Sequence, residues 1–206
     1  MVLKQIFAAL VHHYSTDDLL IAKLWDEIEK SYCRRNRYYH NLGHLETLVR
    51  ELDKYREQIN DWHSVLFSVF YHDIIYNVTR KDNEEKSARL AVQRLGEIHF
   101  PKEQIGVCRQ QILATGTHAE SDDSDTNLFT DADLAILGYE HADYENYCSQ
   151  IRKEYLLYPD FVYNAGRKKV ISHFLQMERI YKTKEFFTQY ETPARQNLQW
   201  ELEQLS

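Results

Sequence analysis

The sequence predicts an all-α fold, and three of its features favour that class. Only six glycines and three prolines occur among 206 residues, whereas glycine and proline together make up roughly 12 % of an average protein. Turn-rich all-β folds need many of both residues. Apolar residues recur with a period near 3.6 through most of the chain. Hydrophobic residues make up 43 % and charged residues 28 %, which provides for a core and excludes a disordered chain.

The apolar pattern predicts nine helices in order. They cover residues 17–32, 41–59, 61–77, a segment from about 82, then 101–115, 127–138, 140–157, 159–177 and 192–205. Ser15 and Asp18 are spaced as a capping box before the first. The segment 61–77 is apolar nearly all round, so we expect it to be the central buried helix.

Glycine and proline mark the ends of several of these helices. Gly138 ends the short helix over 127–138, and the three prolines, Pro101, Pro159 and Pro193, fit first-turn positions. The polar segment 121–127 is predicted to be a loop. No repeat, low-complexity tract or composition shift marks a linker. We therefore expect one domain over 1–206, with a core at about 37–140 and the C-terminal helices of 141–206 packed on it.

The charge balance restricts the partners. Twenty-five basic residues against 32 acidic ones give a net charge of −7, which argues against an extended nucleic-acid partner because such binding needs a basic field. A small phosphorylated metabolite remains compatible with a local basic pocket. The tyrosine-rich C-terminal half leaves a homodimer open.

The cysteines and the N-terminus bear on the compartment. Three cysteines without C-x-x-C spacing indicate reduced thiols rather than a disulfide framework or zinc ribbon. No apolar run reaches 18 residues, and the N-terminal segment lacks a cleavage site of the secretory type. We expect a cytoplasmic protein with no membrane association.

His72 and Asp73 are adjacent within the most apolar segment of the chain. Burying an imidazole and a carboxylate there costs energy, roughly 2–7 kcal/mol for even a neutral polar group, unless both are paired or bind a metal. A hydrogen-bonded core pair is the simplest interpretation of two such residues alone. His44 favours the metal, because it lies one helical turn before Leu48 and so faces the core.

A fourth candidate ligand lies downstream. Asp133 shares a helix face with Ile136 and Leu137 and therefore points inward, whereas Asp131 is expected to cap the helix or to orient a histidine. Two imidazoles and two carboxylates then meet, from His44, His72, Asp73 and Asp133. Such a mixed set suits one divalent ion of Mn, Fe, Co, Ni, Zn or Mg, with positions left for water and substrate.

The order H…HD…D on successive helices resembles the HD-domain superfamily of metal-dependent phosphohydrolases. Five strings carry a closer resemblance to the bacterial group described as predicted metal-dependent HD phosphohydrolases: RYYHNLGHLETL (37–48), FYHDIIYN (70–77), DNEEKSA (82–88), DADLAILG (131–138) and IRKEY (151–155). The match runs from about Arg37 to Arg179. It implies an HD-type helical bundle and assigns His44, His72, Asp73 and Asp133 as metal ligands.

The resemblance also implies that a metal-activated water attacks a phosphoester or phosphoanhydride without a covalent intermediate. Superfamily members with acidic residues four and five positions after the HD histidine differ from this chain, which has Tyr76 and Asn77 there. Asp82 and Glu85 are spaced as a capping box. Glu84, one turn before Ala88, is our candidate general acid or base, with Asp82 as its rival.

Further polar residues are candidates for substrate contacts: Arg37, Tyr39, His40, Asn83 and His118. His40 and His44 have i, i+4 spacing, but HNLGH lacks the glutamate of the H-E-x-x-H zinc protease motif. Surface packing, helix capping or helix-dipole interactions explain the same residues equally well.

These observations predict a phosphohydrolase that acts on a small phosphorylated compound, such as a nucleotide or related metabolite. A non-catalytic metal or nucleotide sensor is the alternative, favoured by the missing carboxylates at 76 and 77. A di-iron oxygenase needs further histidines between the HD pair and the last aspartate, where only His99 and His118 occur.

Overall fold

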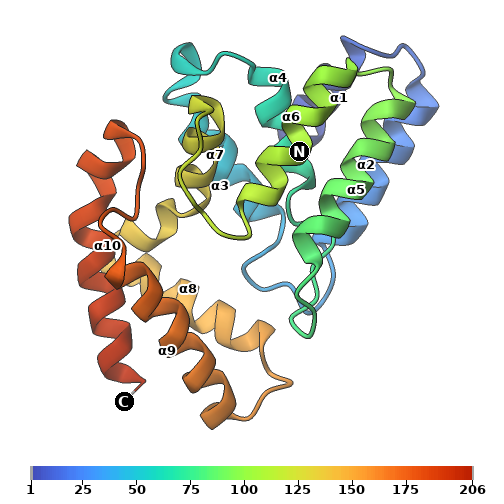
Figure 1. Ribbon diagram of the computed structural model, residues 1–206. Helices are drawn as coiled ribbons and strands as arrows, with labels where there is room; N and C mark the ends of the chain where they lie inside the picture. The colour runs from blue at the N-terminus through green and yellow to red at the C-terminus, as the bar shows by residue number, and fades with distance from the viewer. Residues whose placement is uncertain (1, 206) are drawn as a thin grey trace. The chain divides into compact units, whose positions relative to one another are not determined.

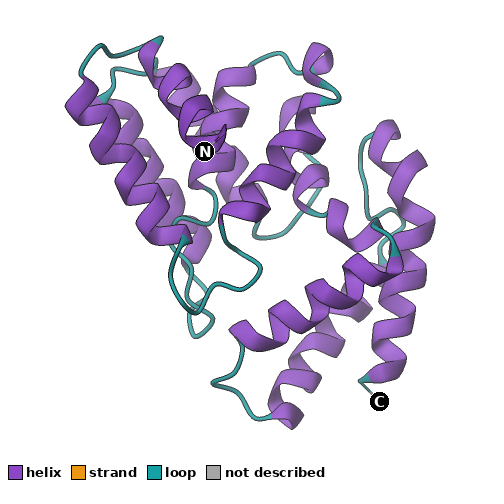
Figure 2. Cartoon of the chain, turned by 180° about the vertical axis from the view of Figure 1, so that it is seen from behind, coloured by secondary structure: helices purple, strands orange, loops and turns teal. Residues whose placement is uncertain are grey.

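The computed structural model describes residues 2–205, and every regular element in that range is a helix (Figures 1 and 2). The all-α prediction is therefore confirmed. The chain divides into two compact units, of which the first ends at Thr130 and the second begins at Asp131. The division falls inside a helix, and the hypothesis of a single domain stays a prediction.

The first unit contains six complete helices and the start of a seventh. They are α1 (Val2–His12), α2 (Asp18–Tyr32), α3 (Leu42–Asp53), α4 (Trp62–Tyr71), α5 (Asn83–Glu97), α6 (Lys102–Ala114) and α7 (Ser124–Asp133), with a 3₁₀ turn η1 (Arg56–Gln58) after α3. Helix α5 packs along α6, and α4 packs against both (Figure 1).

Helix α4 is the centre of this unit, as its apolar sequence predicts. All its residues from Ser64 to Tyr71 are buried. Aromatic rings from neighbouring elements contact it: Phe7 meets Phe70 edge-on with ring centroids 5.1 Å apart, and Phe100 meets Phe67 at 4.8 Å. Such pairs add to the burial energy, so α4 is held firmly in the core of this unit.

The second unit contains a 3₁₀ turn η2 (Ala135–Gly138) and the helices α8 (His141–Glu154), α9 (Asp160–Gln176) and α10 (Lys184–Gln204). Helix α10 packs closely against η2 and also against α9. Charged residues occur along its whole length. Across residues 2–205, no helix combines the length and apolarity needed to cross a bilayer.

Several predicted helix boundaries are wrong. The predicted helix 61–77 ends at Tyr71, so His72 and Asp73 follow the helix instead of lying inside it. The helix predicted over 41–59 ends at Asp53. The N-cap of α2 is Asp17, whose carboxylate accepts from the backbone N–H groups of Leu19 and Leu20, in place of the expected Ser15–Asp18 box.

The boundaries downstream also differ from the prediction. Helix α7 begins at Ser124, three residues before the predicted start of that helix, because the Asp123 carboxylate accepts from the N–H of Thr126 and so caps it. Gly138 ends η2 rather than α7. Pro193 lies inside α10, not in a first turn, and the buried Phe186 and Tyr190 hold the preceding turns in place.

Candidate metal centre

His44 and His72 meet in the first unit, at the seam between α3 and the end of α4. The Asn41 side chain accepts from the N–H of Gly43 and starts α3. His44 consequently lies on the buried face of the helix, one turn before Leu48. His72 caps the C-terminus of α4 and is 1 % exposed. The two Nε2 atoms lie 3.2 Å apart.

The backbone fixes the tautomer of His72. Its Nδ1 lies 2.9 Å from the carbonyl oxygen of Val69, and a carbonyl only accepts, so Nδ1 carries the proton. In the neutral ring Nε2 is then an unprotonated acceptor aimed at His44. This is the arrangement of a metal-bound histidine, whose other nitrogen donates to a carbonyl or carboxylate. The donor set therefore fits a divalent metal.

Asp73 adds a carboxylate beside the two histidines. Its Oδ2 lies 3.3 Å from the Nε2 of His72 and 3.9 Å from the Nε2 of His40. The hydroxyl of Tyr32 on α2 accepts from the backbone N–H of Asp73 at 3.2 Å. Our sequence reasoning missed this role of Tyr32, because its place on the apolar stripe of α2 indicates only a core residue.

Asp133 completes the group that could hold a metal. It is the last residue of α7, a helix that begins in the first unit. One ligand atom from each of His44, His72 and Asp133 lies within 4.8 Å of the others. Asp131 has another role, since its buried carboxylate accepts from the backbone N–H groups of Lys182 and Thr183 and so holds the two residues that precede α10.

Two aromatic side chains, those of Tyr39 and Tyr76, lie beside the histidines. The ring of Tyr39 lies with its centroid 5.0 Å from those of His40 and His44. The His40 ring stacks on Tyr76 at 4.4 Å. Tyr39 and His40, both predicted to contact substrate, therefore lie beside the histidine pair and Asp73. Tyr76, four residues after His72, therefore supplies an aromatic ring beside His40.

Arg37 is 6 % exposed, and its guanidinium has backbone partners. It donates to the carbonyls of His40 and Ile74, each at 3.0 Å. The same group lies over the rings of Tyr32 and Tyr76. These contacts join the segment before α3 to the segment after α4 and so position the candidate metal ligands. The substrate contact of Arg37 stays a prediction.

Asn83 and Ser87 on α5 hold the chain that follows Asp73. The Asn83 side chain accepts from the N–H of Asn77 and donates to its carbonyl, both at 3.1 Å. The Ser87 hydroxyl bonds the N–H and carbonyl of Ile75. The predicted substrate contact of Asn83 is untested, and the structure gives its amide this structural role.

The two candidate acid–base residues differ in surroundings. Asp82 does not cap α5 with its side chain, so the expected Asp82–Glu85 box is absent. A hydrogen bond from Lys86 lowers the pKa of Asp82 below its usual value. Glu84 lies against the end of α6, where its Cγ is 3.4 Å from where a Cβ on Gly116 would stand.

His118 follows the end of α6 in a left-handed conformation with φ 50°. Its N–H donates to the carbonyl of Ala114 at 2.8 Å, so it closes the turn that follows the helix in a conformation that glycine adopts more readily. Such backbone strain in a non-glycine residue is often found at functional sites. Its predicted phosphate contact is untested.

Comparisons with family models, with curated proteins and with solved structures found no match. The chemistry must therefore be argued from the residues. Two buried imidazoles and the Asp133 carboxylate form a set able to bind a divalent ion. The Asp73 carboxylate lies beside His72, and the rings of Tyr39 and Tyr76 lie beside His44 and His40.

Proposed function

We propose that this chain is a metal-dependent phosphohydrolase of the HD type that acts on a small phosphorylated compound. The observation that carries the proposal is the pair of buried imidazoles whose Nε2 atoms lie 3.2 Å apart, with a carboxylate 3.3 Å from one of them. A structural core pair needs only one histidine and one acid. A second histidine aimed at the same point favours a cation between them.

His44, His72, Asp73 and Asp133 would hold the ion. A bound divalent metal lowers the pKa of water from 15.7 to about 7 and neutralises phosphate charge. The chain contributes the geometry: the Val69 carbonyl fixes the His72 tautomer, and the Tyr32 hydroxyl and Arg37 hold the backbone around Asp73.

Other residues would bind the substrate and move protons. His40 and Tyr39 lie beside the ligands and present an imidazole and a phenol to a phosphate group. Glu84 is the better acid–base candidate, because the Asp82 carboxylate is held by Lys86. Tyr76 is half-buried and Asn77 is exposed, and neither carries an acid. We therefore assign the proton-transfer role to Glu84, in the first turn of α5.

Metal content and hydrolysis test the proposal together. We would measure bound metals by mass spectrometry and screen phosphatase and nucleotidase substrates with Mn, Fe, Co, Ni, Zn and Mg. We expect about one ion per chain and metal-dependent phosphate release. His72→Ala should abolish both, because it removes a ligand nitrogen.

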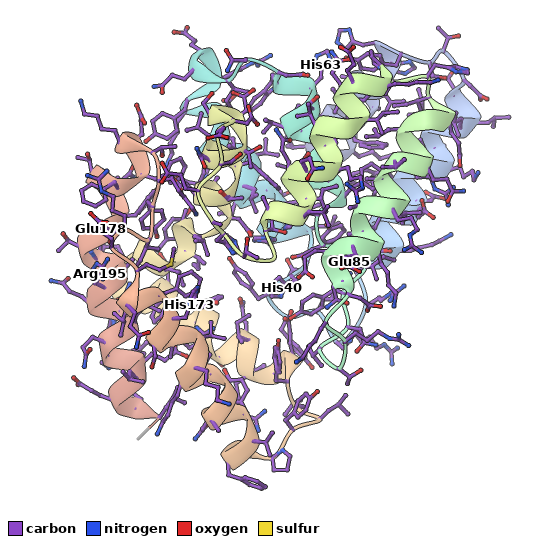
Figure 3. All side chains as sticks on the ribbon, in the orientation of Figure 1. His40, His63, Glu85, His173, Glu178 and Arg195 are labelled. Carbon is purple, nitrogen blue, oxygen red and sulfur yellow. The ribbon has the colours of Figure 1, made fainter. Side chains whose placement is uncertain are left out.

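His63→Ala is the matched control. His63 lies in the first turn of α4, is half-buried and is hydrogen-bonded to Tyr14, but it lies at the end of the first unit away from His40 (Figure 3). Its loss should leave metal content and turnover unchanged. If the intact chain binds no metal under any condition, the proposal is wrong.

A metal or nucleotide sensor is the second candidate. Tyr76 favours it, because its ring stacks on His40 where an acid would assist proton transfer. Metal binding without turnover of any substrate would support the sensor. Two metals per chain with oxygen-dependent activity would instead support an oxygenase.

A further inference from the structure

We propose that the chain self-associates head to tail, with the outer face of α9 from one copy docked in a groove beside α6 of the next. The groove and the helix face are two surface features that the proposed hydrolysis does not use. Each feature lies within one unit. The groove is acidic, and the helix face carries lysines.

The groove lies in the first unit, between one face of α6 and the segment that leads into α7. Its volume is about 790 Å³. It is lined by Glu103, Gly106, Val107, Gln110, Leu113 and Ala114 of α6 and by Ser121, Asp122, Asp123 and Thr126. The α6 residues recur every three or four positions and so form one stripe. Val107 in this stripe is 37 % exposed.

The far wall of the groove is held in shape by its own hydrogen bonds. The Asn127 side chain bonds the N–H and the carbonyl of Ser121 at 2.9 and 2.7 Å. Asp123 accepts from the N–H and hydroxyl of Thr126. A groove with an ordered wall is preformed for a partner and costs little ordering entropy on binding.

The lining of the groove is acidic as well as apolar. It includes Glu103, Asp122 and Asp123 and no lysine or arginine. An occupant that matches it needs apolar and small side chains along one helix face, with positive charge beside them. That pattern is present elsewhere in this chain.

The outer face of α9 in the second unit has this pattern. Phe161, Val162 and Val170 are 76 %, 40 % and 45 % exposed, and they border a broad exposed face, since Phe161 and Val170 are two and a half turns apart. Ala165 and Gly166 lie between them, and Lys168 and Lys169 add two positive charges. Ile171, on the opposite side of the helix, is buried, and Tyr163, two turns before Val170, is buried at the edge of the exposed face.

Small residues allow the two helices to approach closely. A Cβ placed on Gly106 of α6, or on Gly166 of α9, would meet no other atom within 4 Å. Helices pack with axes about 8–10 Å apart, and the side chains at the contact set the distance within that range. The two surfaces are different, so the contact is heterologous and one copy binds the next.

Charge reversal tests the pairing. One variant carries Glu103→Lys and Asp122→Lys in the groove, and the other carries Lys168→Glu and Lys169→Glu on α9. Sedimentation over a range of concentrations should show self-association of the unaltered chain, weakened by salt because the charges are exposed. Each variant alone should associate at least tenfold more weakly. An equimolar mixture should recover association, because each altered groove then meets an oppositely charged α9.

Cross-linking tests the location of the contact. In a Cys33→Ser background, which removes the exposed thiol, chains with Gly106→Cys and chains with Gly166→Cys should form a disulfide only when mixed. A chain that stays monomeric at all concentrations would overturn the proposal. Disulfides formed by Gly166→Cys chains alone would also overturn it, since they place α9 against α9. Association that persists in both charge-reversed variants, each measured alone, would assign the contact to another surface and likewise overturn it.

Discussion

His72 illustrates how a backbone contact prepares a side chain for chemistry. The ring follows the last turn of α4, and the Val69 carbonyl, three residues earlier, accepts a hydrogen bond from its Nδ1–H. Its Nε2 is then the acceptor that faces the Nε2 of His44 across 3.2 Å. A proton carried by His44, or a cation, can occupy the position between the two nitrogens. Asp73 supplies negative charge on the same side.

Glu84 and Glu85 provide a matched pair of residues for the proton-transfer role. Glu84 lies against Gly116, whereas Glu85 on the same turn is exposed (Figure 3). If Glu84 is the general acid or base, Glu84→Gln should lower kcat by about 10²–10⁴-fold. Glu85→Gln should leave kcat unchanged. Turnover of the identified substrate at saturating metal measures both, and equal rates for the two variants would assign the role elsewhere.

At the scale of elements, periodicity predicts which segments are helical but not where each helix stops. Ile74 and Ile75 continue the apolar pattern of α4, yet the chain leaves the helix before His72. The reason is tertiary: Ser87 and Asn83 on α5 bond the backbone of Ile75 and Asn77. No local signal in the sequence carries those bonds.

The candidate ligands were more predictable than their surroundings. The His44 position follows from its spacing to Leu48, and the HD pair from its apolar context. Tyr32 was unpredictable as a partner of Asp73, because its contact joins residues 41 positions apart. A core tyrosine and a positioning tyrosine have the same sequence pattern.

Gly138 and Gly106 test close packing between elements. A Cβ on Gly138 would stand 2.6 Å from the Cβ of Tyr190 and 2.7 Å from its carbonyl oxygen, so η2 and α10 must separate. Gly138→Ala should lower the free energy of unfolding by about 1–3 kcal/mol. Gly106→Ala, in open space within α6, should raise it by about 0.5–1 kcal/mol. Urea denaturation measures both, and opposite signs are the expected result.

A buried ion pair joins α9 and α10. The Arg167 guanidinium donates to both carboxylate oxygens of Glu201 at 2.7 and 2.9 Å, and Tyr144 donates to the same carboxylate. Burial acts to raise the pKa of Glu201, but the Arg167 bonds and charge outweigh it and leave the pKa below its usual value. The pair should therefore stabilise the fold only while Glu201 is ionised.

The sign of the pH dependence follows from that direction. Because the Glu201 pKa is lower in the folded chain, its stabilisation is present above about pH 4.5 and is lost as the pH falls through the folded value. Arg167→Met should cost about 3–5 kcal/mol at pH 7, since it leaves a buried carboxylate without its cation. Glu201→Gln should flatten the acid slope of urea denaturation. Glu203, exposed on the same helix, is the control, and Glu203→Gln should leave the acid slope unchanged. An equal acid slope in the unaltered, Glu201→Gln and Glu203→Gln chains would contradict this account.

At the level of the full chain, most of the candidate metal ligands and the buried ion pair described above lie in different units. His44, His72, Asp73 and the residues that position them all belong to the first unit, whereas the Arg167–Glu201 pair lies in the second. Ligand binding stabilises the folded state of whatever binds it. Added metal should therefore raise the unfolding free energy of the unit that binds it.

The three tryptophans allow that dependence to be measured in the full chain. Trp25 and Trp62 lie in the first unit and Trp200 in the second. A Trp200→Phe chain reports unfolding of the first unit, and a Trp25→Phe/Trp62→Phe chain reports the second. At a free metal concentration of about 100 times Kd, binding should add about 2.7 kcal/mol to the unfolding free energy of the first unit.

In a His72→Ala background the same metal should add nothing, because the site has lost a ligand. A metal-induced shift that survives His72→Ala would place the ion elsewhere. A shift confined to the first-unit probe shows that the ligands of that unit dominate binding, and a shift of equal size in both probes shows that the two units unfold together.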